Sequence, residues 1–111
     1  MQPKAVARIA VALALTAVAP AFVAASPSEA FCARDLSATD TRLRHALVRL
    51  EETRNLPMPQ RCTAFRDHLR AMTQAASVFE RCSTGRTRSE NVGQMVGSIA
   101  DWRVIIARNC Q

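Results

Sequence analysis

Four cysteines are the residues of this 111-residue chain whose chemistry is most distinctive: Cys32, Cys62, Cys82 and Cys110. Cysteine thiolates act as nucleophiles or zinc ligands, and oxidised cysteines pair as disulfides. A zinc knuckle places two cysteines about two to four residues apart, and no pair in this chain has that spacing. We therefore expect no metal and no cofactor, and disulfide formation becomes the leading hypothesis for these residues.

One cysteine also lies in a short motif. The segment Cys82-Ser83-Thr84-Gly85-Arg86-Thr87-Arg88-Ser89 follows the pattern C-x2-G-x2-R-S. These eight residues resemble the phosphate-binding signature of the cysteine-dependent protein tyrosine phosphatases. The resemblance implies that Cys82 is a nucleophile, Arg88 a phosphate clamp and Ser89 a thiolate partner. The chain departs from the family pattern at Arg81, where a histidine is usual, and in the helical pattern that precedes the cysteine. Two hypotheses follow: the chain has no enzymatic activity, or, as the alternative, it has phosphatase-like activity at this segment.

The first 25 residues have the composition of a secretory signal peptide. Lys4 and Arg8 precede an apolar run, and 19 of these 25 residues are apolar. Small residues favour cleavage after Ala25, with Ala30 as the second candidate. We expect residues 26–111 to form one periplasmic or secreted domain without a transmembrane segment, in a compartment where cysteines oxidise. Retention of the first segment as a membrane anchor is the alternative.

Apolar spacing predicts three helices, at about 35–54, 59–82 and 88–109, and hence a small all-α antiparallel three-helix bundle. The first helix carries a leucine seam, formed by Leu36, Leu43, Leu47 and Leu50, with Asp35 or Asp40 as its N-cap. The second helix has an apolar seam on one side. On the opposite side it has a stripe of small residues, formed by Ala64, Ala71, Ala75 and Val78, so it can pack against neighbours on two sides.

The third helix is expected to start with a capping box from Thr87 to Glu90, after a left-handed stop at Gly85. Gly93 and Gly97 lie beside its apolar face. Because glycine is unfavourable in an exposed helix, we expect both glycines to contact the small stripe of the second helix rather than a second copy of the chain. The chain is therefore expected to be a monomer.

Helix positions predict the disulfide pairing. Cys32 begins the first helix and Cys82 ends the second, whereas Cys62 begins the second and Cys110 ends the third. Other pairings would span about 30 Å along a helix of about 20 residues. A disulfide needs Cα atoms within about 7 Å. The predicted disulfides are therefore Cys32 with Cys82 and Cys62 with Cys110.

Arginine dominates the charge of the predicted mature domain. Residues 26–111 contain 13 arginines, no lysine and nine acidic residues. In an exported domain, this excess favours an anionic envelope component or an acidic protein as partner over nucleic acid. An anion-binding site is predicted at the Cys32–Cys82 end, near the start of the third helix, from Arg34, Arg81, Arg86 and Arg88. His45 is expected to be solvated and His68 to be partly buried and structural. The expected function is therefore a non-enzymatic binding or scaffolding module.

Overall fold

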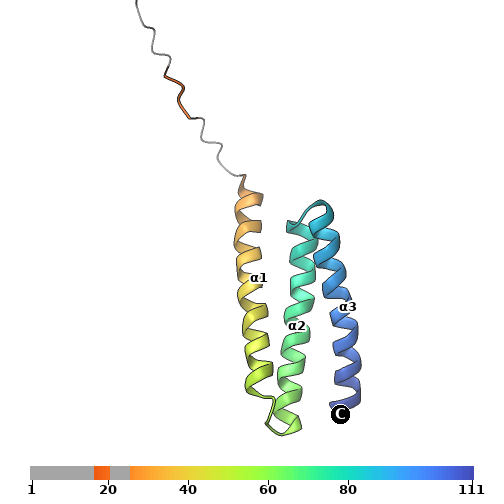
Figure 1. Cartoon of the computed structure of the whole chain (residues 1–111). Helices are drawn as coiled ribbons and strands as arrows, with labels where there is room; N and C mark the ends of the chain where they lie inside the picture. Colours follow the sequence, from red (N-terminus) through yellow and green to blue (C-terminus); the bar gives the residue numbers. More distant parts are fainter. Residues whose placement is uncertain (1–16, 21–25) are drawn as a thin grey trace, which may run out of the picture.

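Three antiparallel helices form the computed structural model, which describes residues 17–20 and 26–111. They are α1 (Pro27–Glu52), α2 (Met58–Cys82) and α3 (Gly85–Asn109), and the described residues contain no strand. Figure 1 shows the three helices side by side with α2 between the other two. Helix α2 packs against both α1 and α3, whereas α1 and α3 do not approach each other closely. The predicted all-α three-helix bundle is thus confirmed, with α2 as its centre.

The predicted signal peptide, residues 1–25, lies outside the described residues except for 17–20. Within the described part of the chain, no helix has an apolar stretch long enough to cross a membrane.

Helix α1 starts eight residues earlier than predicted. Ser26 is its N-cap, and the Ser26 hydroxyl accepts a hydrogen bond from the Glu29 amide at 3.2 Å. The Glu29 carboxylate in turn accepts from the Ser26 amide at 2.8 Å, which completes a capping box. The predicted caps Asp35 and Asp40 are therefore wrong, since both lie inside the helix. As a result, Cys32 lies in the second turn of α1 rather than at its first residue.

Helix α3 also starts earlier than predicted. Its N-cap is Thr84, whose side chain makes no capping hydrogen bond, so Thr87 lies inside the helix and the predicted capping box is absent. Gly85 has the predicted left-handed backbone, with φ of 56°, but it is the first residue of α3 rather than the stop of α2. Only Ser83 and Thr84 separate the two helices, and the left-handed glycine permits this tight reversal.

Small residues bury the contact between α1 and α2. The most buried residues of α1 are Thr39 and Ala46, and Ala64 and Ala75 of α2 have no exposed surface. Leu47 is 55% exposed, so its assignment to the buried seam is wrong. The buried positions of α1 are small, which lets the helix backbones approach, and the larger Leu47 lies to one side of this face.

The predicted contact of Gly93 and Gly97 with the stripe of α2 is also wrong. A Cβ atom added at either glycine would meet no atom within 4 Å. The small side of α2 is occupied by α1 instead: Ala71 lines the same groove as Ala46 of α1. Helix α3 packs on the other side of α2, where the Trp102 ring lies 5.3 Å from that of Phe65.

The core is thin. Nine residues of the described chain are buried, and no large side chain is fully enclosed. The buried residues are Thr39, Ala46, Cys62, Ala64, His68, Met72, Ala75, Val78 and Ile99. Burial of apolar surface is the main stabilising contribution to folding, so a core of mostly small residues needs support from covalent links.

Candidate functional site: the disulfide-linked ends and the basic surface

Two disulfides tie the outer helices to α2, one near each end. Cys32 pairs with Cys82, with Cα atoms 5.1 Å apart, and Cys62 pairs with Cys110, with Cα atoms 5.7 Å apart. These are the pairs that the helix positions predict. Each outer helix is therefore linked to the central helix once, and no cysteine is free.

The phosphatase-like segment has a different context from that of a nucleophilic cysteine. Cys82 is the last residue of α2, and its sulfur is bonded to Cys32. Gly85, Arg88 and Ser89 belong to the first turns of α3. Nucleophilic attack requires a thiolate, and a disulfide sulfur does not provide one. The segment in this state therefore acts as a helix connection.

The four arginines of the predicted anion site fall into two groups. The Arg34 guanidinium lies 5.4 Å from the centre of the Phe31 ring, and Arg81 forms an ion pair with Asp35 at 3.6 Å. Both of these arginines are therefore engaged along α1 and α2. Phe31 is exposed.

Arg86 and Arg88 form the second group, in the first turn of α3. Both are exposed, and neither makes an ion pair within the described residues. The first turn of α3 has no acidic residue and no side-chain cap, so its free amides add a partial positive charge. Arg81 and Arg88 line different pockets, and each pocket includes a glutamate, Glu29 or Glu80. The structure therefore does not bring the four predicted arginines into one pocket.

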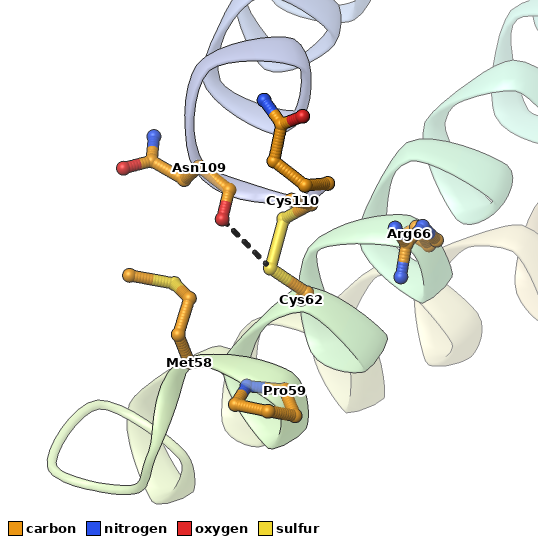
Figure 2. Close-up of a pocket in the computed structure, with 7 residues that line it drawn as sticks. Met58, Pro59, Cys62, Arg66, Asn109 and Cys110 are labelled. Carbon is orange, nitrogen blue, oxygen red and sulfur yellow. Dashed lines mark hydrogen bonds between the residues drawn. A yellow bond between two sulfur atoms is a disulfide. The ribbon is translucent and has the colours of Figure 1, made fainter.

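The opposite end of the bundle holds a pocket around the second disulfide. Figure 2 shows Met58 and Pro59 of α2 facing Asn109, the last residue of α3, and the following Cys110 across this pocket. The Cys62 sulfur lies 3.6 Å from the carbonyl oxygen of Asn109. Arg66 also lines the pocket. Since the cysteine sulfur is oxidised, this contact joins the start of α2 to the end of α3 and offers no thiolate.

The sequence analysis missed a groove between α1 and α2. Its lining residues are Arg42, His45, Ala46 and Arg49 of α1 and Asp67, Arg70, Ala71 and Gln74 of α2. His45 is exposed, as predicted, and it lies among these charged side chains. The signal that could have found the groove is the shared spacing of i, i+3, i+4 and i+7 in both helices, which puts each set on one helix face.

His68 is the most enclosed titratable side chain near the centre of the bundle. It is 6% exposed, and its ring lies edge-on to the Trp102 ring at 4.8 Å between centres. Its Nδ1 atom has no hydrogen-bond partner among the residues that the structure describes. Burial lowers the pKa of His68, because the charged imidazolium loses its hydration. The structural role predicted for His68 agrees with this position.

Comparisons of the chain with protein-family models, with curated proteins and with solved structures find no match. Within the described residues, no group of three or more histidine, cysteine or acidic side chains is placed to hold a metal ion. Function is therefore inferred from the fold, the disulfides and the charged surface.

Proposed function

We propose that this chain is an exported, non-enzymatic module that binds or scaffolds an anionic component of the cell envelope. The observation that carries the proposal is the pairing of all four cysteines in two disulfides. Disulfides persist in oxidising compartments, which agrees with the signal-peptide composition of the first 25 residues. A paired Cys82 also lacks the thiolate that the phosphatase alternative requires.

The start of α1 supports cleavage after Ala25. Such a cut makes Ser26 the first residue of the mature domain, so the capping box of Ser26 and Glu29 stays intact. The new α-amino group of Ser26 would also lie next to the Glu29 carboxylate. Cleavage after Ala30 would remove both capping residues and the first turn of the helix, which makes it the poorer candidate.

Exposed arginine supports an anionic partner. Of the 13 arginines in residues 26–111, five form ion pairs with acidic residues: Arg44, Arg49, Arg54, Arg70 and Arg81. Arg86 and Arg88 are exposed without such a partner, next to the uncapped start of α3. Guanidinium groups form strong, directed hydrogen bonds with phosphate and carboxylate oxygens.

Mass spectrometry of the protein from its host, before and after alkylation, tests export and thiol state together. We expect a mature chain that starts at Ser26 and takes up no alkylating reagent. A free, reactive Cys82 would contradict the proposal and would favour the phosphatase-like alternative.

Binding is tested by flotation with lipid vesicles. We expect the oxidised protein to bind vesicles that contain anionic lipid at low salt, and to dissociate as the salt concentration rises. Equal binding to neutral and anionic vesicles would contradict an anionic partner.

A further inference from the structure

The groove between α1 and α2 has two matching walls. Each wall consists of four residues with the spacing i, i+3, i+4 and i+7. The wall from α1 starts at Arg42, and the wall from α2 starts at Asp67. Because the helices are antiparallel and Arg49 pairs with Asp67, the residue seven positions after Asp67 lies level with the residue seven positions before Arg49. Gln74 therefore faces Arg42 across the groove. Figure 1 shows α1 and α2 adjacent along this length.

The floor of the groove is formed by small side chains. Ala46 is buried and Ala71 is half-buried, and both lie midway along the groove. Methyl groups leave room that longer side chains would fill, and the pocket has a volume of about 210 Å³. The long side chains of Arg42 and Arg70 stand at the rim, where their guanidinium groups stay in contact with water.

Asp67 holds two of the three arginines in place. It is 34% exposed in its side chain, and its two oxygens lie 3.0 Å from Arg70 and 3.9 Å from Arg49. One carboxylate cannot neutralise three guanidinium groups, and Arg42 makes no ion pair within the described residues. The groove therefore has a surplus of two positive charges.

Two further hydrogen-bonding residues complete the lining. Gln74 lies level with Arg42, and the exposed His45 lies level with Ala71. An imidazole donates at least one hydrogen bond in either protonation state. An anion in the groove would thus meet charged and neutral donors from both helices.

We propose that this groove binds a phosphate monoester dianion, between Arg42 and Arg70 with His45 and Gln74 as further donors. A phosphate monoester carries a charge of about −2 near neutral pH, which matches the surplus of the groove. The several oxygens of phosphate suit donors that come from two helices better than a single carboxylate does. The inference builds on the proposed function, because it names the anion and the site that binds it.

Titration of the oxidised protein with inorganic phosphate at low salt, followed by NMR, tests the site. We expect saturable shifts of the resonances from His45, Arg42 and Gln74. The double variant Arg42→Gln and Arg70→Gln should weaken phosphate binding by about tenfold or more, since it removes two charged hydrogen-bond donors. The double variant Arg103→Gln and Arg108→Gln removes the same charge from exposed positions of α3 and should leave the affinity within about twofold.

A second arm identifies the source of the phosphate. Vesicles of phosphatidylcholine with phosphatidic acid present the same monoester on a lipid, and flotation compares the two double variants on them. Loss of vesicle binding in the groove variant, with retention in the α3 variant, supports the groove and a lipid source. If the groove variant loses binding to free phosphate but still binds the vesicles, the result supports the groove and a soluble source of phosphate.

The two proposals fail in different ways. If the groove variant binds phosphate and vesicles as tightly as the unmodified protein does, while the α3 variant binds neither, the groove site is wrong and the binding function stands. If equal weakening follows from both variants, binding depends on overall charge and the groove site is again wrong. If the unmodified protein binds neither phosphate nor anionic vesicles, both proposals are wrong.

Discussion

His68 illustrates how a single residue connects the core to solution conditions. Its imidazole is enclosed between α2 and Trp102 of α3, and burial lowers its pKa from the ordinary value of 6.5. The folded chain therefore takes up a proton at this site at lower pH than the unfolded chain does. Protonation consequently favours unfolding.

We predict that the free energy of unfolding is independent of His68 above about pH 7.5 and decreases as the pH falls below about 6.5. Thermal melting between about pH 7.5 and 5 measures the effect. The variant His68→Gln should show a smaller decrease, whereas His45→Gln, which changes an exposed histidine, should match the unmodified protein. An equal decrease in both variants would show that His68 is not responsible.

Residue types alone were sufficient to predict the cysteine pairs, because each pair requires only the approximate start or end of a helix. They were insufficient for the groove of Arg42, Arg49 and Arg70, because this site depends on which faces of α1 and α2 meet. The predicted face is wrong at Leu47: large apolar residues suggest the seam, while Thr39 and Ala46 are the buried residues of α1. Small residues contribute little to a hydrophobic pattern, although they determine how closely helices pack.

At the scale of the helices, the ends differ in how they are capped. Ser26 and Glu29 satisfy backbone groups at the start of α1, whereas α3 starts without a side-chain cap. The sequence predicts a cap at Asp35 or Asp40 for the first helix and a capping box for the third, because Thr87 and Glu90 have the capping-box spacing. That spacing occurs inside helices as well, so it identifies a helix start only together with the backbone before it.

Substitution of Ser26 by alanine should destabilise the fold by about 1 kcal/mol, since it removes the hydroxyl that accepts from the Glu29 amide. Urea denaturation measures this change. The matched variant Thr87→Ala should change stability by less than about 0.5 kcal/mol, because Thr87 is an exposed residue within α3. A larger cost at Thr87 than at Ser26 would contradict the observed helix starts.

The glycines of α3 give a second test at this scale. Gly93 and Gly97 are exposed and have space for a methyl group, so alanine at either position should stabilise the fold by about 0.5–1 kcal/mol. Alanine at Gly85 should destabilise it, because the φ of 56° is unfavourable for a residue with a Cβ atom. Destabilisation at Gly93 and Gly97 would show that another surface contacts this face of α3.

At the scale of the whole molecule, covalent links compensate for a thin core. Helix α2 is the sole neighbour of both α1 and α3 within the described chain, so each outer helix has one packing surface and one disulfide. The linked residues are 50 and 48 positions apart in the sequence. In the chain-entropy model, closing loops of this length stabilises the folded state by about 4 kcal/mol for each disulfide.

The general architecture was predictable because three apolar periodicities and two prolines separate the helices clearly along the chain. The separation of α1 from α3 was not predictable. The positions of the helices in the sequence do not determine the angle at which two helices pack around a central one. Because each outer helix packs against α2 alone, we expect the stability of the bundle to depend on oxidation.

Thermal melting of the oxidised and the reduced protein, under otherwise identical conditions, tests this dependence most directly. We predict that reduction of both disulfides lowers the melting temperature by well over 5 °C or removes the cooperative transition, because a loss of about 1 kcal/mol alone shifts a small domain by about 4–8 °C. A reduced protein that melts within about 5 °C of the oxidised one would contradict the account of a small bundle held together by Cys32–Cys82 and Cys62–Cys110.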